Sequence, residues 1–269
     1  MFGILRGARG ERVFRLATLG ALALLALFFL GIVVSMLAYT RWDTFVRALL
    51  SEEILFAIRL SLVTATVAAV ISILIAVPVA YAISRASFPG KDIVDSLLDL
   101  PIVISPVALG AALLVFFNTP LGSAINQNVV KFVFAVPGII LAQVTVISAL
   151  AIRLLKSTFD NIDPRYEQVA RTLGCSQPEA FFRVTLPLAR DGLIASGILT
   201  WARAVGEFGA TVTLAGATAL RTETLPTAIF LGLASADVGK AIAVIFVLVI
   251  IAVAALLVIR KLIGRRYQI

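Results

Sequence analysis

Histidine is absent from the 269-residue sequence, and cysteine occurs once, at Cys175. The missing histidines exclude imidazole catalysis and histidine metal sites, and the lone cysteine excludes an internal disulfide and a Cys/His zinc site. The sequence also lacks the G-x-x-x-x-G-K-[ST] loop that cradles nucleotide phosphates, so the chain is not itself an ATPase. Paired carboxylates and Ser/Lys dyads are missing from the centres of its apolar runs, which leaves an intramembrane enzyme without support.

Charged residues are scarce, at 14% of the chain, whereas hydrophobic residues make up 61% and the mean hydropathy is +1.06. Soluble domains carry about 25% charged residues, so this composition indicates an integral membrane protein. A helix needs about 20 apolar residues to span a bilayer. Apolar runs that meet this need are expected at residues 16–38, 54–83, 100–117, 133–152, 192–215 and 238–259.

The first apolar run follows a basic start, as a secretory signal peptide does. Residues 16–38 exceed the roughly 7–15 apolar residues of a signal core, and no small-x-small cleavage site follows them. We therefore expect an uncleaved helix. The run at 54–83 is longer than the bilayer requires, which predicts a tilt, a kink or a projecting end.

The distribution of Lys and Arg predicts how the chain crosses the membrane, because cytoplasmic loops are enriched in these residues. With both termini placed in the cytoplasm, sixteen of the 23 basic residues fall on cytoplasmic segments. Arg265 and Arg266 are among these sixteen, whereas Arg41 falls on an outer segment. The pattern predicts an all-α polytopic membrane protein with six transmembrane helices, in one domain over residues 1–269. It also explains the net charge of +8 without nucleic acid as a partner.

One polar stretch interrupts the apolar chain, within the longest predicted cytoplasmic connection, residues 153–190. Its signals predict two short helices. Asp163 suits the N-cap of the first helix, and Gly174 suits the left-handed residue that ends it. Ser176 and Glu179 have the spacing of a capping box for the second helix.

Pro187 is expected to end this second helix, because proline disrupts a helix interior. Two helices about a glycine also outline a DNA-binding helix-turn-helix, but a segment between membrane spans is poorly placed to enter a DNA groove. Two other interpretations stay open. The unit is either an amphipathic connector at the membrane surface or a docking element for a cytoplasmic partner.

The stretch QVARTLGCSQPEAFFRVTLP resembles the EAA signature of ABC importer permeases, E-A-A-x3-G-x9-I-x-L-P. Gln168, Val169 and Ala170 stand in the first three places, Gly174 in the glycine place and Val184 in the isoleucine place. Gln168, Val169 and Val184 depart from the literal signature, but its spacing holds. The resemblance implies a coupling helix that sits in a cleft of a separate ATP-hydrolysing subunit. The residues implied for this role are Glu167, Gln168, Val169, Ala170, Arg171, Leu173, Gly174 and Pro187.

A second polar feature lies in the fifth apolar run, WARAVGEFGATVTLAG. Arg203 and Glu207 stand four residues apart, so on a helix they share a face. A charge within a span is by default a functional hypothesis. The pair either neutralises itself and holds the bundle together, or lines or gates a pathway. Further pathway candidates are Gly206 and Gly209, which allow close helix packing or a local break in the helix. Thr211 is also a candidate, because its hydroxyl can donate a hydrogen bond either to an oxyanion or to a backbone carbonyl of its own helix.

The segment ARAVGEFGAT is similar to one found in permeases for sulfate, molybdate and tungstate. Its continuation, LAGATALRTETLPTAIFLGLASAD, and residues 80–114 are most similar to molybdate and tungstate permeases. The resemblance implies an ABC type I importer permease fold and passage of molybdate or tungstate from an external binding protein into the cytoplasm by alternating access. It implies a homodimer in the cell membrane with two cytoplasmic ATPase subunits. ATP and Mg would be bound by those subunits, and this chain would bind no cofactor.

Two alternatives remain open. A sulfate or thiosulfate permease shares nearly all of these features. A stand-alone channel or secondary carrier explains six spans and an intramembrane charged pair, but not the unit at 168–187. The resemblance assigns the outer loops, residues 39–53, 118–131 and 213–237, to the binding protein, and there Arg221 and Glu223 are expected to be exposed.

Overall fold

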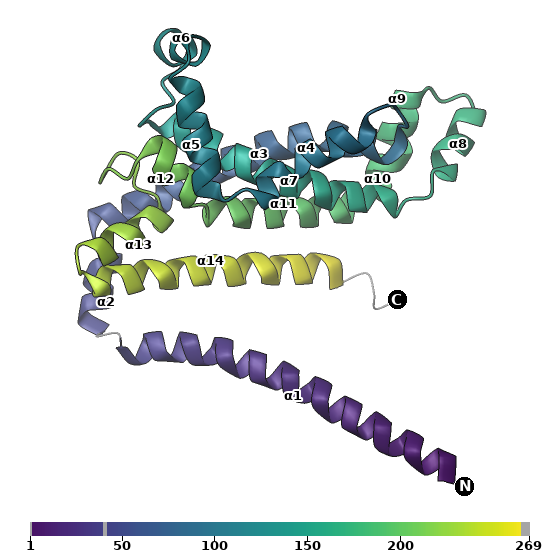
Figure 1. The fold of residues 1–269 in the computed structure, drawn as a ribbon, viewed down its shortest axis with the longest axis horizontal. Helices are drawn as coiled ribbons and strands as arrows, with labels where there is room; N and C mark the ends of the chain where they lie inside the picture. Colours follow the sequence, from purple (N-terminus) through teal and green to yellow (C-terminus); the bar gives the residue numbers. More distant parts are fainter. Residues whose placement is uncertain (1, 40–41, 265–269) are drawn as a thin grey trace.

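The computed structural model describes residues 2–39 and 42–264, and within these ranges the chain is helical, with no strand. The predicted all-α class is therefore confirmed. Arg41, Arg265 and Arg266, which entered the predicted charge pattern, lie outside the described residues. The helices run mostly along one long axis, and shorter helices cap both ends of the bundle (Figure 1).

Three long helices form the centre of the bundle: α3 (Glu52–Arg85), α7 (Val136–Asp160) and α11 (Arg190–Val205). They approach closely because their facing sides carry small residues. Ala76 and Ala80 of α3 pack with Ala151 of α7 in one buried cluster, and Ala68 and Ala204 lie in a second. Small side chains let helix backbones come close, which is how helices associate where apolar burial alone gives no preference.

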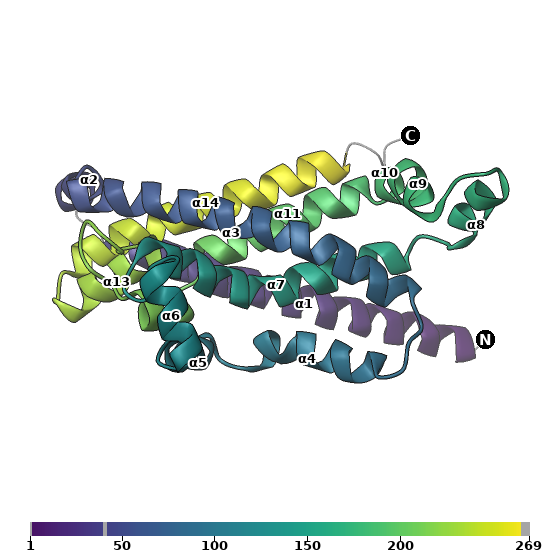
Figure 2. The ribbon, with the colours of Figure 1, turned by 90° about the horizontal axis from the view of Figure 1, so that it is seen from above.

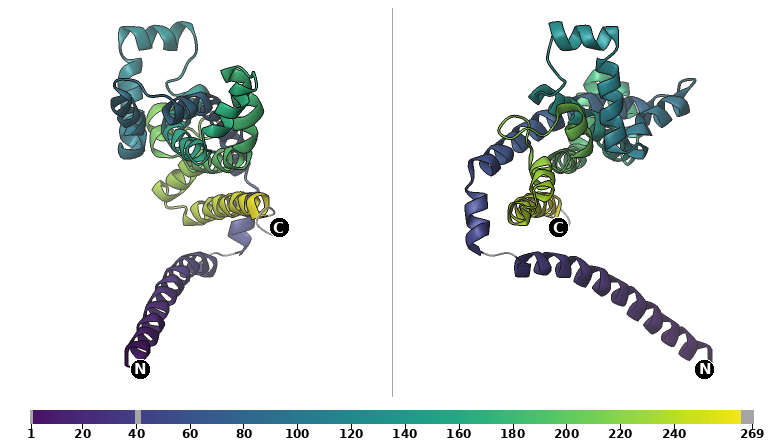
Figure 3. Two further views of the ribbon diagram at one scale, coloured as in Figure 1. Left: turned by 90° about the vertical axis from the view of Figure 1, so that its right-hand side faces the viewer. Right: turned by 60° about the vertical axis from the view of Figure 1, so that its left-hand side comes forward.

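Helix α14 (Val238–Gly264) lies along this centre, and α2 (Trp42–Leu49) and α13 (Leu225–Ala234) cover its first turns. Ile54, Leu225 and Val244 are buried together there. Helix α1 (Phe2–Tyr39) stands apart from the bundle (Figure 3). In the apolar span Val13–Met36 of α1, the most apolar 18-residue window is 0% buried against the other described residues.

The predicted third span, residues 100–117, is not one helix. It falls on α4 (Lys91–Val103) and α5 (Pro106–Phe117), which meet at 109°. Ser105 caps α5 by accepting from the Ala108 N–H at 3.3 Å, and Pro106 occupies its first turn, where a missing N–H costs nothing. Helix α4 then lies against α7, where Arg153 Nη1 is 2.8 Å from Asp95 Oδ1.

The predicted fifth span, residues 192–215, is also broken. Helix α11 ends at Val205, and α12 (Gly209–Ala215) begins after a short break. By length and composition, four helices can cross a membrane, or five if α4 and α5 count as one span. The total of six spans stays a prediction, because it requires α11 and α12 to cross together.

The two ends of the bundle differ. Helices α8 (Arg165–Thr172) and α9 (Gln177–Ala180) project at the end where α1 begins and α14 finishes (Figures 1 and 2). Helices α2, α6 (Pro120–Asn128) and α13 lie at the opposite end. The predicted cytoplasmic segment, the start of α1 and the end of α14 are thus on one side of the molecule.

Candidate functional site

The projecting segment has the helix–glycine–helix form that its sequence predicts. The backbone N–H of Arg165 donates to Asp163 Oδ1 at 2.9 Å at the start of α8. Gly174 ends the turn with φ +96°, in the left-handed region that favours glycine. The N–H of Cys175 reaches back to the Ala170 carbonyl at 3.1 Å, which satisfies one of the carbonyls exposed at the helix end.

The capping box at the start of α9 is confirmed. The N–H of Ser176 donates to Glu179 Oε2 at 2.8 Å, and the N–H of Glu179 donates to Ser176 Oγ at 3.4 Å. The helix then widens into a π-helical stretch, Phe181–Thr185.

The second helix was expected to end at Pro187, and the structure ends it one residue later. Pro187 lies within α10 (Leu186–Leu188), and a turn at Ala189 separates α10 from α11. In the π-helical stretch the Leu186 N–H bonds to the Phe181 carbonyl, five residues back. Such an extra residue in the turn is one of the ways a helix accommodates a proline that lacks an N–H.

The residues implied for coupling divide into two faces of the segment. Glu167 and Ala170 are about 9% exposed and turn inward. The outward group includes large apolar side chains that a solvated helix would not need, among them Val169 at 57% and Leu173 at 81% exposed. The outward residues are Gln168, Val169, Arg171, Leu173, Gly174 and Pro187, with Tyr166 and Phe182 beside them. This outward group suits a docking surface.

Glu167 anchors α8 to the end of α3. Its Oε2 accepts from the Tyr81 hydroxyl at 2.7 Å and its Oε1 from Arg85 Nε at 3.1 Å. Arg85 Nη2 also donates to the Ile162 carbonyl at 2.7 Å. Burial acts to raise the pKa of Glu167, but the hydrogen bonds to its carboxylate outweigh burial and lower the pKa. Glu167 is therefore ionised at neutral pH.

The break between α11 and α12 is built around Glu207. Arg203 Nη1 is 2.7 Å from Glu207 Oε2, so the predicted pair forms. Glu207 does not lie on α11 with Arg203, because the helix ends at Val205. Its Oε1 instead accepts from the Ala210 N–H at 3.1 Å and caps α12, where a negative charge is favourable. The Glu207 side chain is 1% exposed and that of Arg203 is 39% exposed.

The glycines about this break have different roles. Gly206 is exposed and follows the last residue of α11, so of its two expected roles, close packing or a local break, it takes the local break. Gly209 lies against α5, since a Cβ there would be 2.9 Å from the backbone N of Val107. Across the same contact, a Cβ on Gly110 would be 2.8 Å from Cα of Ala210. Helices α5 and α12 are thus in backbone contact through glycine.

Buried polar groups next to the break were not singled out by the sequence. Gln143 of α7 is 1% exposed and donates from Nε2 to the Ala204 carbonyl at 3.1 Å. Among the described residues, Gln143 Oε1 and the predicted Thr211 hydroxyl have no hydrogen-bond partner. An amide within an otherwise apolar run is the signal that could have identified Gln143.

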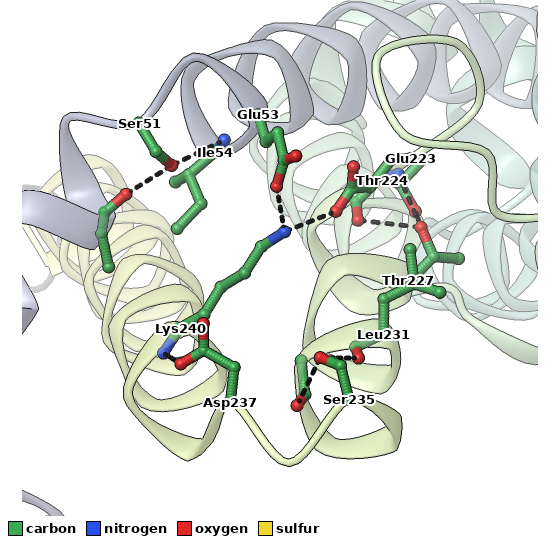
Figure 4. Close-up of polar contacts among 12 residues, drawn as sticks. Ser51, Glu53, Ile54, Glu223, Thr224, Thr227, Leu231, Ser235, Asp237 and Lys240 are labelled. Carbon is green, nitrogen blue, oxygen red and sulfur yellow. Dashed lines mark hydrogen bonds and ion pairs between the residues drawn. The ribbon is translucent and has the colours of Figure 1, made fainter.

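A second charged cluster lies at the opposite end of the molecule. Lys240 Nζ, in the first turn of α14, pairs with Glu53 of α3 and lies 3.4 Å from Glu223 Oε1 (Figure 4). The expectation that Glu223 is exposed is wrong, because its exposed fraction is 0%. Arg221 is exposed, as expected. The sequence could not show that Lys240, far from both carboxylates in the chain, lies beside Glu53 and Glu223.

Comparison with protein families gives one match over most of the chain. Residues 68–268 match the family described as binding-protein-dependent transport system inner membrane component. This range includes the projecting segment, the α11–α12 break and α14.

Several curated proteins are similar in sequence. A probable molybdenum ABC transporter permease protein of Haloferax volcanii is 38% identical over 213 residues, 79% of this chain and 77% of that protein. A molybdate/tungstate transport system permease protein of Thermococcus kodakarensis is 36% identical over 64% of this chain and 66% of that protein. A sulfate transport system permease protein of Synechococcus elongatus is 35% identical over 68% of this chain and 64% of that protein.

The fold is also similar to that of a solved structure. One chain in the crystal structure of a bacterial alginate ABC transporter, in complex with an alginate pentasaccharide-bound periplasmic protein, matches with a TM-score of 0.71. The match covers 94% of both chains, and their sequences are 18% identical.

Proposed function

Because the chain belongs to the family of binding-protein-dependent transport system inner membrane components, we propose that it is the permease subunit of an ATP-driven importer for molybdate and tungstate. The observation that carries the proposal is the projecting helix α8. It stands away from the bundle and presents Val169 and Leu173 outward, yet is held at its root by Glu167. A transporter subunit with no nucleotide site of its own needs such a rigid docking element.

The partners follow from the two ends of the molecule. At one end α8 docks into a cytoplasmic ATPase subunit, which binds ATP and Mg. At the other end α2, α6 and α13 receive an external binding protein. Six segments cross the membrane, with α4–α5 and α11–α12 each counted as one, and both termini are cytoplasmic. Two copies of the chain pair with two ATPase subunits, and the anion passes between the copies.

The transport cycle in this proposal is alternating access. ATP brings the two ATPase subunits together and moves the paired α8 helices, and the passage opens outward to receive the anion. Hydrolysis returns it to the inward-open form. A ligand shifts such an equilibrium only by its different affinity for the two states. In this proposal the contacts between α8 and the ATPase differ between the two states and so supply the difference in affinity. Helix α8 can make these contacts because it projects from the bundle on the side of the ATPase.

The pathway residues belong to the α11–α12 break. Arg203 is the one cation there among the described residues and is half-exposed, so it can meet an anion, while Glu207 limits how tightly the anion is held. Gly206, Gly209 and Thr211 complete this region. Broken helices are tolerated at membrane depth where they line a cavity or are buried in protein. A weak passage fits an importer whose selectivity lies in the binding protein.

Sulfate import is the second candidate, because the sulfate permease of Synechococcus elongatus is nearly as similar as the molybdenum relatives. Molybdate, tungstate and sulfate are all tetrahedral dianions. The molybdenum permease of Haloferax volcanii matches more of the chain, which favours molybdate. A stand-alone channel or secondary carrier has no use for α8.

Uptake into proteoliposomes tests the proposal. Vesicles would carry the chain with its cognate ABC ATPase, and ATP would be supplied on the side of the membrane where the ATPase sits. Labelled molybdate and the binding protein would be supplied on the opposite side. We expect ATP-dependent uptake that excess tungstate blocks and excess sulfate does not. If excess sulfate blocks uptake, the chain is instead a subunit of a sulfate importer. Uptake in vesicles that lack the ATPase would contradict the importer function altogether.

A further inference from the structure

We propose that Glu167, Tyr81 and Arg85 form a positioning contact that transmits movement of α8 to α3, and that α3 carries this movement to the outer end of the molecule. The inference rests on the proposed importer function. It assigns to Glu167 a role different from the ATPase contact implied by the resemblance, because its carboxylate faces α3 and is 9% exposed.

The contact joins α8 to one face of a single helix. Tyr81 and Arg85 are four residues apart on α3, so both reach the same carboxylate. The Tyr81 ring is also fixed, since it packs edge-on against Phe159 at 5.8 Å and Phe181 at 4.7 Å between centroids. Charge-assisted hydrogen bonds of this kind are stronger than neutral ones. Helix α8 therefore cannot shift without either moving the end of α3 or breaking these bonds.

Neighbouring bonds attach the preceding residues to the same end of α3. Ser84 donates to Asp160 Oδ1 at 2.6 Å, and Arg85 donates to the Ile162 carbonyl at 2.7 Å. The end of α7, the turn after it and α8 are thus all held by one and a half turns of α3. The connection from α7 to α8 is braced against α3 rather than free to hinge.

Helix α3 is suited to transmit displacement because it is unbroken. Its 34 residues extend through the bundle, about 50 Å at the usual rise per residue. Helices α4–α5 and α11–α12, in contrast, are interrupted within the bundle. Among the described helices of the bundle, α3 is the longest that joins the α8 end to the outer end.

At its outer end α3 holds the elements that form the outer surface. Ser61 Oγ accepts from the Leu225 N–H at 2.7 Å, which fixes the start of α13. Glu53 pairs with Lys240, and Lys240 in turn lies beside the buried Glu223 in the loop before α13 (Figure 4). A displacement of α3 therefore acts on α13, its preceding loop and the first turn of α14 together.

Transport stoichiometry tests the inference. Tyr81→Phe removes one hydroxyl and keeps the ring, and Glu167→Gln keeps the shape of the side chain. We expect each variant to lower the molybdate ions transported per ATP hydrolysed by roughly tenfold, within the usual range of coupling between sites, with hydrolysis changed less than about twofold. The double variant should transport as many molybdate ions per ATP as Glu167→Gln alone, because both substitutions disrupt the same contact.

A matched control is available on the same helix. Thr66→Val removes a different α3 hydroxyl, which accepts from Trp201 Nε1 at 3.0 Å, without touching α8. We expect its stoichiometry to equal that of the wild type. Hydrogen exchange of the detergent-solubilised chain gives a second measurement, with faster exchange expected in α8 for Tyr81→Phe and not for Thr66→Val.

The outcomes separate the two proposals. Wild-type uptake that is independent of the ATPase overturns the importer function, and the transmission role with it. Wild-type coupling together with unchanged stoichiometry in Tyr81→Phe and Glu167→Gln overturns the transmission role alone. Loss of ATPase binding in these variants would also overturn it, because Glu167 would then act in docking.

Discussion

At the scale of single residues, Gly174 is the clearest conformational requirement. Its φ of +96° is one that side-chain-bearing residues rarely adopt, and nothing lies within 4 Å of a Cβ built there. A substitution therefore acts through backbone strain alone. We expect Gly174→Val to insert normally and to lose most ATP-dependent uptake, because a β-branched residue costs at least about 1–2 kcal/mol in this conformation.

The companion variant Gly174→Asn makes the measurement specific. Asparagine tolerates the left-handed region better than other side chains, so uptake should be largely retained, with equal amounts of both variants in the membrane. Uptake by Gly174→Val at the wild-type rate would show that coupling to the ATPase does not depend on the geometry of this turn.

Arg203 and Glu207 allow the structural and pathway interpretations of the pair to be separated. Arg203→Met leaves the buried Glu207 carboxylate with only the Ala210 N–H. We expect the free energy of unfolding to fall by about 1–3 kcal/mol, the usual cost of leaving a buried polar group without its partner. The double variant Arg203→Met, Glu207→Gln should regain stability, because no unpaired charge remains.

Uptake by the same double variant decides between the interpretations. A pathway role predicts a stable protein with little molybdate uptake, measured beside its thermal midpoint in detergent. Full uptake by the double variant would show that the pair only neutralises itself within the bundle.

Individual charges show where the sequence was sufficient and where it was not. The Arg203–Glu207 pair is local and forms as its four-residue spacing predicted, although it forms across the end of α11 rather than along one helix. Glu223 was expected to be exposed because a loop carboxylate is normally solvated. Its buried carboxylate instead lies beside Lys240, which also pairs with Glu53, and these three residues are far apart in the sequence. No local pattern carries that information.

At the scale of elements, the contact of α5 with α12 depends on the absence of side chains. A Cβ on Gly110 would be 2.8 Å from both Cα and the carbonyl oxygen of Ala210. We expect Gly110→Ala to separate the helices and lower stability by about 1–3 kcal/mol, the usual cost of overpacking. Thermal unfolding in detergent measures the change.

Gly197→Ala is the matched control for this variant, since nothing lies within 4 Å of a Cβ at Gly197 in α11. It should not lower the midpoint, and the higher helix propensity of alanine favours a small increase. Equal midpoints for Gly110→Ala and Gly197→Ala would contradict the close approach of α5 and α12.

The element boundaries were predictable to different extents. The glycine turn and capping box of the projecting segment follow from local chemistry, and both were predicted correctly. The length and hydropathy of the third apolar run predict one span. Ser105 and Pro106 are the usual start of a new helix, and they mark the 109° bend in the structure. Hydropathy averages over such a signal, whereas capping chemistry locates it.

At the scale of the whole molecule, composition predicted the all-helical membrane class, and charge placement predicted that the projecting segment and the chain termini share one side of the membrane, which stays a prediction. Composition and charge placement could not predict which helices stay unbroken. Helix α3 continues past Pro78, whereas α11 ends at Val205. The difference lies in the buried Glu207, which caps α12 and thereby favours a new helix start. The full-length α3 is the feature from which the transmission role was inferred.

The native Cys175 tests the orientation of the whole molecule, because the sequence contains no other thiol. Cys175 is partly exposed and follows Gly174 at the end of the bundle assigned to the cytoplasm. In the chain expressed without an ATPase, we expect a membrane-impermeant maleimide to label inside-out vesicles and not intact cells. Mass shift of the labelled chain measures the accessible fraction.

The opposite end supplies the reference for this measurement. In a Cys175→Ser background, Asn128→Cys places a thiol at the end of α6, where Asn128 is exposed. This thiol should be labelled in intact cells and protected in inside-out vesicles, because α6 lies at the other end from α8 (Figure 2). Labelling of both thiols from one side would invert or break the assigned topology. It would also place α8 where no cytoplasmic ATPase could reach it.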